Sequence, residues 1–416
     1  MARYDIVVLG AGIVGICVAL HLQKRARSVV LVDRRGAAEE TSFGNAGLIQ
    51  REGVYPYGFP HDFGALLRYG FNRTIDAHYH LSALPKLAPF LWQYWHHSRP
   101  ARHAEVARRY AKLIEHCVSE HEALIAEAGA GELVRRDGWM KVFRTARERD
   151  LRFAEAERWR DEFGINHRQL DARMLQEAEP HLAPVLAGAL HWTDPISVHD
   201  PQGLALAYLK LFERLGGRFV QGNAASLEAE GGGWRLRTAE GPLQASGAVI
   251  ALGPWADGLT RALGYDLPLA VKRGYHMHYR AAGEAKLNHP ILDVERGYFM
   301  GPMQRGIRLT TGAEFALRDA IRTPVQLGRA EPIARDLFPL AERLDNEPWM
   351  GARPCTPDML PVIGPAPQHA NLWFAFGHAH HGLTLGAVTG RLVAQMVTGE
   401  QTFVDPAPYS AARFGK

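Results

Sequence analysis

Three glycines near the start of the chain, Gly10, Gly12 and Gly15, stand at the spacing of a phosphate-binding turn. Gly10 permits a tight turn, Gly12 lets the backbone approach a pyrophosphate, and Gly15 lets the following helix pack closely on the sheet. The N-terminus of that helix offers free N–H groups and a partial positive charge to phosphates. Asp33 ends the next apolar segment, where its carboxylate can accept hydrogen bonds from a ribose. These residues predict a dinucleotide site but do not by themselves separate FAD from NAD.

Three further segments of small residues and glycine favour FAD. The loop 41–47 can pass close to a pyrophosphate or a flavin ring, although alone it fits an ordinary connection equally well. The apolar strand 248–252 is followed by Gly253, where the backbone can pass a cofactor without a side-chain clash. The turn 377–384 leads into a helix whose N-terminus would face an electron-rich ring edge. Reduced flavin carries negative charge near its N1 and O2 atoms, which such a helix end would stabilise.

The elements that must position these turns are typical of an α/β fold. The first strand is continuous and rich in β-branched residues, as in parallel strands that are buried on both faces. A helical pattern and a second apolar strand follow it, and further strand patterns recur in the second half of the chain. We expect strands at 4–9, 28–32, 218–220, 248–252 and 372–376, a hairpin of 234–238 with 243–245, and helices through Leu22 and over 385–397.

The composition narrows the remaining possibilities. The chain has 416 residues, 47% of them hydrophobic, so it is long enough for two folded domains. Its net charge of +4 comes without long single-sign blocks, which argues against nucleic-acid binding. Three widely separated cysteines (Cys17, Cys117, Cys355) indicate neither a disulfide framework nor a zinc site and fit a reducing compartment. The apolar run 6–20 is too short to span a bilayer and contains the glycine turn, so we expect a cytoplasmic protein.

The order of these motifs resembles a known family. The segments GAGIVG, TSFGNAG, the ALG strand end, RPCTPDMLPVIGP and GHAHHGLT make the chain similar to the D-amino acid dehydrogenase branch of the amine- and D-amino-acid-oxidising flavoproteins, which include glycine and sarcosine oxidases. The resemblance implies an α/β (α+β overall) fold in which a mostly antiparallel substrate domain is inserted into a Rossmann-like FAD domain. We expect the FAD domain to comprise 1–85, 188–266 and 346–416, and the substrate domain 86–187 and 267–345.

The resemblance also implies roles for single residues. Arg353 would hold the substrate carboxylate in a two-pronged fork, the arrangement in which guanidinium binds carboxylate best. Without the resemblance, a salt bridge between domains would explain Arg353 equally well. Tyr298 would contact the substrate, and His380 and His381 occupy the turn that supplies a residue over the flavin ring.

Further candidates come from the residues themselves. Tyr275 is a candidate partner for the substrate carboxylate or amine, although tyrosines in strands usually serve packing. An imidazole in the 377–384 turn could accept a proton from the substrate ammonium or could instead contact the flavin or cap the helix. His276 and His278 alternate with Tyr275 and Met277 on one strand, so only one of the two pairs can face a pocket. We expect no metal site.

The cofactor-binding residues are expected along these same turns. They would hold FAD through backbone N–H groups, small side chains and the Asp33 carboxylate. The predicted set is Gly10, Gly12, Ile13, Val14, Gly15, Asp33, Arg34, Thr41, Ser42, Asn45, Ala46, Gly47, Ala251, Gly253, Gly377, His381, Gly382, Leu383 and Thr384.

The chain also departs from its relatives. Some sarcosine oxidases attach FAD through a cysteine near the TPD segment, and by spacing that cysteine falls on Gly351, not on Cys355. We therefore expect FAD to bind non-covalently. Sarcosine oxidases place a lysine near the flavin for reaction with oxygen, and Arg308 falls at that position. The turn after Gly377 also differs from that of D-amino acid dehydrogenases, which leaves the preferred substrate side chain open.

Together these patterns predict an enzyme that removes hydride from the carbon bearing nitrogen and passes it to flavin N5. The expected substrate is a D-amino acid, with a D-proline derivative as a variant, and the electrons would pass to a quinone or carrier. The alternatives are an oxygen-using glycine or sarcosine oxidase, or a subunit of a larger electron-transfer complex. The segment 81–95, rich in Leu, Phe and Trp, could contact a membrane surface or quinone partner, or could be a helix that covers the substrate domain.

Overall fold

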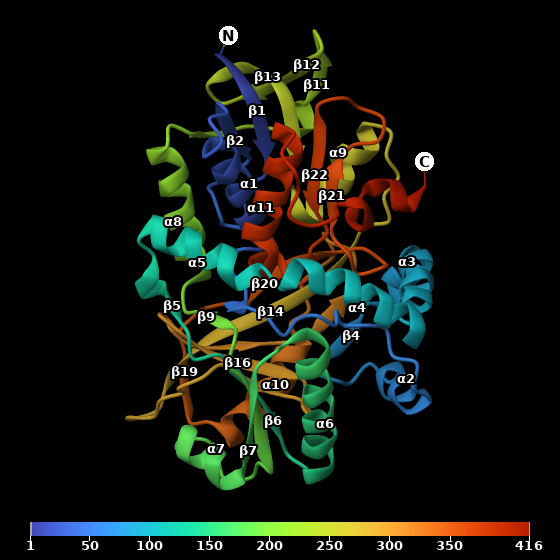
Figure 1. Cartoon of the computed structure of the whole chain (residues 1–416). Helices are drawn as coiled ribbons and strands as arrows, with labels where there is room; N and C mark the ends of the chain where they lie inside the picture. Colours follow the sequence, from blue (N-terminus) through green and yellow to red (C-terminus); the bar gives the residue numbers. More distant parts are fainter. Residues whose placement is uncertain (1, 416) are drawn as a thin grey trace.

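The computed structural model describes residues 2–415 and contains two large sheets, one above the other in Figure 1. The upper sheet has eight strands, and its centre is parallel in the order β10-β2-β1-β13. β22 extends it in parallel from β13, and β12 pairs with β13 as an antiparallel hairpin. The strands are β1 (Ala2–Leu9), β2 (Val29–Asp33), β10 (Arg218–Gln221), β11 (Glu228–Glu230), β12 (Gly233–Thr238), β13 (Gly241–Ile250), β21 (Val362–Pro365) and β22 (Leu372–Phe376).

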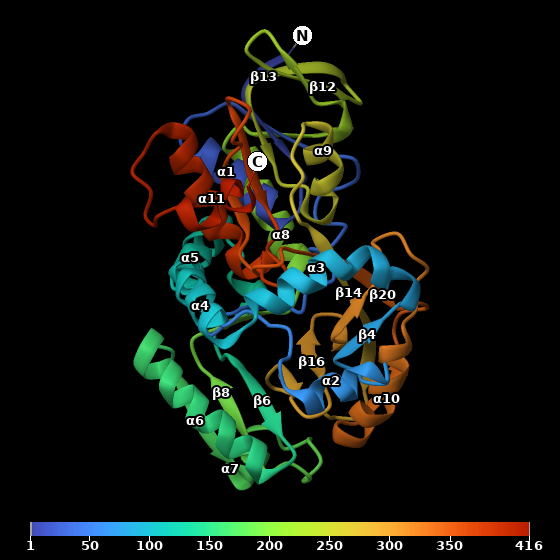
Figure 2. The same cartoon turned by 90° about the vertical axis from the view of Figure 1, so that its right-hand side faces the viewer.

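Both faces of this sheet are covered, which explains its continuous apolar strands. Ile6 and Val8 of β1 belong to a core that includes α1 (Ile13–Gln23) and α11 (Gly382–Thr398), whereas Val7 and Leu9 face a second core on α9 (Ala256–Ala262). Figure 2 shows α9 on the opposite side of the sheet from α1 and α11. The buried strand therefore needs apolar residues at every position, and its carboxyl end is left free for a ligand.

The lower sheet has eleven strands and is mostly antiparallel. The strand β14 is its longest member, and it pairs with β17, β18, β19 and β20. α6 (Ala146–Phe163), α7 (Ala172–Ala178) and α10 (Val325–Leu337) pack against this part of the molecule (Figure 1). The strands are β4 (Ala77–Tyr79), β6 (Trp139–Phe143), β7 (His167–Asp171), β8 (Gly188–Trp192), β14 (Ala270–Ala281), β15 (Ile291–Asp293), β16 (Tyr298–Met303), β17 (Gly306–Thr310), β18 (Ala313–Phe315), β19 (Leu340–Arg343) and β20 (Trp349–Cys355).

Three helices from the first third of the chain cross the junction between the two sheets in Figure 1. They are α3 (Leu84–His97), α4 (Pro100–Ile114) and α5 (Cys117–Ala128), while α8 (Pro201–Arg214) packs on α1 and α2 (Phe63–Gly70) lies at the periphery. A small sheet of β3 (Leu48–Ile49), β9 (Ile196–Val198) and β5 (Val134–Arg135) lies among them. No helix within residues 2–415 combines the length and the apolar character that a membrane span requires.

The predicted fold class is confirmed, and the strand predictions need one correction. The segments 243–245 and 248–252 form one strand, β13, because nothing interrupts it at Gly247, where the backbone packs directly against Ile6 and Trp373. The sheets also divide the chain differently from the expected domain boundaries. β4, β8 and β20 come from stretches assigned to the FAD domain but pair within the lower sheet. β20 does so because all seven of its residues pair with β14.

Candidate active site

A cavity of about 1120 Å³ lies between the two sheets and is lined by residues of both. At its upper end it touches the residues that follow the carboxyl ends of the parallel strands β1, β2 and β13, where open α/β sheets bind their ligands. At its lower end it touches β14 and β20 of the larger sheet. Its volume exceeds that of most single-ligand pockets, so it has room for a dinucleotide and a small substrate together.

The glycine turn after β1 has the close packing that its sequence predicts. Gly10 has a φ of +103°, and a Cβ there would lie 2.5 Å from the carbonyl oxygen of Ala251. A Cβ on Gly15 would lie 1.8 Å from the carbonyl oxygen of Gly10. Gly12, the N-cap of α1, has no side chain to occupy the space in front of the helix. The turn therefore presents a bare helix N-terminus to the cavity, and this cradle fits a pyrophosphate.

Two side chains hold this turn in place from its flanks. Asp33 accepts a hydrogen bond from the Ala11 backbone N–H (2.8 Å), and the Ser42 hydroxyl accepts one from the Ile13 N–H (2.9 Å). The Arg34 guanidinium lies 4.6 Å from the centre of the Trp255 ring at the same end of the cavity. A carboxylate with one oxygen engaged by the turn still has acceptor capacity for a ribose hydroxyl.

The second predicted helix N-terminus also reaches the cavity. Gly382 and Leu383 at the start of α11 line it. Thr384 is buried and points elsewhere, since its hydroxyl donates to the Leu48 carbonyl (3.1 Å) and accepts from the Gln50 N–H (3.2 Å). Thr384 therefore fixes the helix to β3 instead of contacting a ligand.

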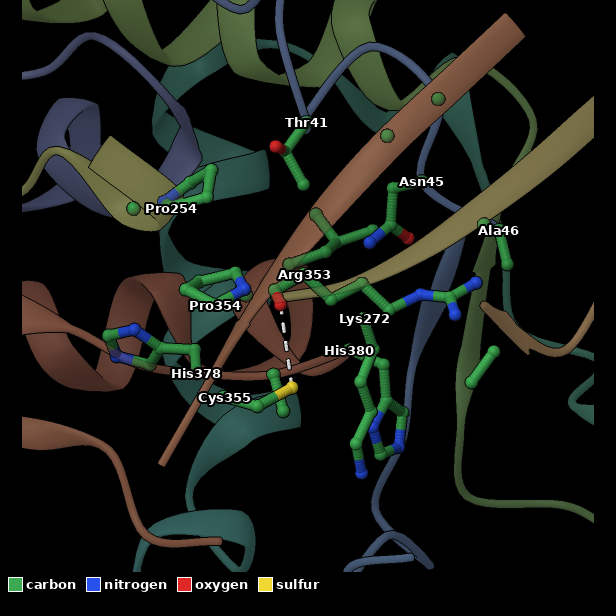
Figure 3. A pocket seen from close by; sticks show the side chains of 18 of the residues that line it. Thr41, Asn45, Ala46, Pro254, Lys272, Arg353, Pro354, Cys355, His378 and His380 are labelled. Atoms are coloured by element: carbon green, nitrogen blue, oxygen red, sulfur yellow. Dashed lines mark hydrogen bonds between the residues drawn. The ribbon is translucent and has the colours of Figure 1, made fainter. Parts of the chain in front are cut away.

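Arg353 lines the lower end of the cavity (Figure 3). Its guanidinium lies over Gly274, where a Cβ would be only 2.3 Å from Nη2, and Nη1 donates to the Gly312 carbonyl (3.0 Å). No carboxylate of residues 2–415 forms an ion pair with it. Burial lowers the pKa of Arg353, because the charged form loses solvent without gaining an anion. A guanidinium held in this state has the chemistry to bind a ligand carboxylate.

Of the two predicted histidines, His380 and His381, the structure brings only His380 to the cavity, which His378 of the same turn also lines. The His380 ring lies 4.9 Å from the Tyr57 ring, and burial, with smaller effects from His381 and Arg353, lowers its pKa well below its usual value. His381 points behind the wall, where its Nδ1 lies 2.7 Å from the Tyr110 hydroxyl and burial lowers its pKa to about 3. The expected catalytic and cofactor roles of His381 are therefore corrected, because successive residues of a tight turn point in different directions.

Tyr298 is also directed away from the cavity. It is buried in the core of the lower sheet, and its neighbour Phe299 lines the cavity instead. This corrects the expected substrate contact of Tyr298, and the physical reason is the two-residue alternation of a strand.

Tyr275 lines the cavity wall, but its hydroxyl is engaged by protein groups. It donates to Glu314 (2.8 Å) and accepts from Arg273 Nη2 (3.1 Å) and from the Thr323 N–H (2.9 Å). The hydroxyl therefore holds a buried ion pair together and is not free for the substrate. On the same strand His276 also lines the cavity, and its ring is stacked on Trp349 with 4.8 Å between ring centres.

The only group of potential metal ligands among residues 2–415 is His78, His80 and Glu314. The Glu314 carboxylate already accepts from Arg273 Nε at 2.6 Å. A cation there would have to compete with this buried guanidinium, so the group is a hydrogen-bonded core cluster.

Most of the predicted cofactor residues line the one cavity. Those that do not are Gly15, Gly47 and Gly377, whose part is in backbone packing, together with His381 and Thr384 described above. The lining residues are Gly10, Gly12, Ile13, Val14, Asp33, Arg34, Thr41, Ser42, Asn45, Ala46, Ala251, Gly253, Gly382 and Leu383.

The structure shows the surroundings of Gly351 and Arg308, two positions at which the sequence departs from its relatives. Gly351 lines the cavity without a side chain, and the Trp349 indole fills the space, 2.1 Å from where a Cβ would lie. The Cys355 thiol donates to the Arg353 carbonyl (3.4 Å), and burial raises its pKa, which keeps it protonated and unreactive. Arg308 lies outside the cavity wall, where its Nε donates to His278 Nε2 (3.0 Å).

Sequence reasoning missed Lys272, which lines the cavity beside Arg353 and His380 (Figure 3). Lys272 directly opposes Arg353 across the β14–β20 pair. The signal was available, because Lys272, Gly274 and His276 alternate on β14 and a charged residue is unusual on an inward face.

The fold and this cavity are typical of a dinucleotide-binding protein with a second, mostly antiparallel sheet. The family model described as FAD dependent oxidoreductase (DAO) matches residues 5–396, and the chain belongs to this family. The family is FAD-dependent, so FAD is the dinucleotide that the cavity holds.

Similar proteins agree with this assignment. A D-amino acid dehydrogenase of Cereibacter sphaeroides is 31% identical, covering 98% of this chain and 95% of its own. A D-amino-acid oxidase of Bradyrhizobium diazoefficiens is 29% identical, covering 98% of both chains. The crystal structure of glycine oxidase from Geobacillus kaustophilus has the same fold, with a TM-score of 0.74 over 99% of both chains at 24% identity. The chain is therefore an amino acid oxidoreductase.

Proposed function

We propose that this enzyme oxidises a D-amino acid at its α-carbon and passes the electrons to a quinone or carrier. When bound, FAD would supply the two-electron acceptor for the hydride of the Cα–H bond, and the substrate nitrogen would lose a proton, so that the amino acid would leave as an imino acid. Water then converts the imino acid into a 2-oxo acid and ammonia. A quinone takes the two electrons and completes the cycle.

The observation that carries this proposal is the unpaired Arg353 guanidinium between the two sheets. It would bind the substrate α-carboxylate in a bidentate fork and so fix the position of the α-carbon. Orientation of this kind supplies a large part of the rate enhancement in a reaction that needs one C–H bond aimed at one acceptor atom.

Among the imidazoles that line the cavity, His380 lies beside Lys272 and Arg353 and could receive the amine (Figure 3). Because its pKa is lowered well below the usual value, it is neutral at pH 7 and is a weak proton acceptor. We propose that it accepts a hydrogen bond from the amine and that the substrate enters hydride transfer with a neutral nitrogen.

Anaerobic addition of D-amino acids to the purified flavoprotein is expected to bleach the long-wavelength flavin band. A panel of D- and L-amino acids, D-proline derivatives, glycine and sarcosine gives the substrate class. Fast recolouring with a quinone analogue and slow recolouring in air is the expected result. Rapid recolouring in air with release of peroxide would instead identify an oxidase. If no compound bleaches the flavin, the D-amino acid assignment fails, and co-purifying subunits that restore activity would identify a complex.

A quinone acceptor would reach the enzyme from a membrane, and an exposed apolar surface suits such a contact. We define this surface by Phe63, Leu67, Phe71, Leu81 and Trp92, which lie on or beside α2 and α3 and are all more than half exposed. α2 has no buried residue at all, although its N-cap is intact. Helices with this pattern bind lipid interfaces, and nearby exposed basic residues favour anionic lipids.

The membrane contact can be tested by vesicle flotation. Replacing Phe63, Leu67 and Phe71 by serine is expected to lower partition onto phosphatidylglycerol-containing vesicles by at least about tenfold, since each apolar side chain contributes roughly 1 kcal/mol or more on burial. Leu151→Ser, at a comparably exposed leucine on α6, is the matched control. Equal flotation of the triple variant and the unaltered protein would contradict the proposed surface.

A further inference from the structure

Two cations stand side by side at the substrate end of the cavity without an anion to balance them. Lys272 on β14 and Arg353 on β20 are direct cross-strand partners. Neither forms an ion pair with a carboxylate of residues 2–415. Like charges at directly opposed positions of a sheet destabilise it, so the arrangement costs stability unless a ligand supplies negative charge.

The environment of Lys272 keeps its ammonium beside the cavity. Its Nζ lies 3.8 Å from the centre of the Tyr94 ring and 5.5 Å from that of Phe315, a cation–π arrangement that holds a charge without neutralising it. In Figure 3 the Lys272 and His380 side chains extend in one direction from the wall, whereas the Arg353 side chain extends in another. The two cations therefore diverge from neighbouring strand positions and offer two separate anion positions.

The acidic residues on the cavity wall do not offset these charges. Asp33, Glu39 and Glu40 belong to the nucleotide end, and Asp76 is paired with Arg68 (3.0 Å). The result is a local excess of positive charge in a desolvated cleft, which attracts anions strongly.

Another cavity cation, Lys141, is a weaker candidate for an anion site. Its Nζ lies among the rings of Trp139, Trp159 and Trp192, at 5.6 to 5.9 Å. Burial lowers the pKa of Lys141, and nearby carboxylates of Glu155 and Glu52 oppose that shift. Since these carboxylates already compensate part of its charge, Lys141 needs no ligand anion.

We propose that the substrate is an amino acid with two carboxylates, in which Arg353 holds the α-carboxylate and Lys272 the second one. This inference rests on the proposed function. Cross-strand Cβ atoms lie about 5 Å apart, and two diverging side chains can bracket the carboxylates of a four- or five-carbon amino dicarboxylate. The second carboxylate can be in the side chain, as in D-glutamate, or on a nitrogen substituent, as in an N-carboxymethyl amino acid.

The test compares acidic substrates with isosteric neutral ones. We expect kcat/KM for D-glutamate or D-aspartate to exceed that for D-glutamine or D-asparagine, and an N-carboxymethyl amino acid tested beside them distinguishes the two sources of the second carboxylate. In Lys272→Met, KM for the acidic substrate is expected to rise about 10- to 100-fold, the range of one hydrogen bond to a charged group, while KM for the amide changes little. Lys210→Met, at an exposed lysine on α8, is the matched control.

Two outcomes would overturn the inference. One is a preference for neutral substrates in the unaltered enzyme. The other is an equal loss for acid and amide in Lys272→Met, which would place Lys272 at the cofactor. If no D-amino acid is oxidised, the proposed function fails, but the site can still be tested by flavin difference spectra. Glutarate is then expected to bind more tightly than butyrate and to lose this advantage in Lys272→Met, and equal binding of the two acids would overturn the inference.

Discussion

Replacing Arg353 by methionine is expected to lower kcat/KM for the amino acid substrate by about 100- to 1000-fold. Truncating one partner of a buried charged hydrogen-bonded pair costs about 2–5 kcal/mol, and here the partner would be the substrate carboxylate. Arg353→Lys keeps the charge but loses the fork, so we expect an intermediate loss. Steady-state kinetics with a quinone analogue, at matched FAD content, provides the measurement.

The thermal stability of the Arg353→Met variant distinguishes a substrate-binding role of Arg353 from a structural one. A guanidinium that ties two domains together would destabilise the protein when removed. Arg353 has no anionic partner and is desolvated, so its replacement by methionine is expected to leave Tm unchanged or to raise it. Arg168→Lys, on an exposed position of β7, is the control for a conservative change in the same sheet. A large loss of Tm together with unchanged KM would contradict the proposed role.

The parts of the site that local sequence determines were predictable. The glycine turn depends on a positive φ at Gly10 and on close packing at Gly15, and no residue with a side chain fulfils both. The β12–β13 hairpin and the helix α11 likewise follow from local patterns, and the structure contains both. Such elements are determined by residues that are near one another in the chain.

Other parts of the site depend on which face of a strand a residue occupies and on partners that are distant in the sequence. Local sequence patterns could not predict these parts. Alternation on β14 does not show which of Tyr275 and His276 can offer its polar group to a ligand; both line the cavity, and the Glu314 carboxylate that engages the Tyr275 hydroxyl is distant in the sequence. Tyr298 was expected to contact the substrate, but its neighbour Phe299 lies on the side of β16 that faces the cavity. The interest of Lys272 as a site residue depends on Arg353, which is distant in the sequence and lies directly opposite Lys272 in the sheet.

The second large effect is expected at the cofactor turn, where Gly12→Ala should weaken FAD binding by about 100-fold or more. A methyl group at the N-cap of α1 would occupy the position at which the pyrophosphate approaches the helix. The protein itself tolerates that methyl, because a Cβ on Gly12 would lie 3.3 Å from the movable Ser42 hydroxyl and no positive φ is required. Titration of the apoprotein with FAD, followed by flavin fluorescence, gives the affinity.

Two matched glycine variants distinguish a loss of FAD binding from a loss of folding stability. Gly10→Ala combines an unfavourable φ of +103° with a Cβ 2.5 Å from the Ala251 carbonyl, so it is expected to lose both FAD and apoprotein stability. Gly328→Ala, in α10 with no atom within 4 Å of its Cβ, is expected to keep FAD and to gain about 1 kcal/mol of stability. Because Gly12→Ala alone should lose FAD at unchanged apoprotein Tm, it isolates the contact between backbone and pyrophosphate. Retention of FAD by Gly12→Ala would mean that the phosphates lie farther from this helix than its bare N-terminus implies.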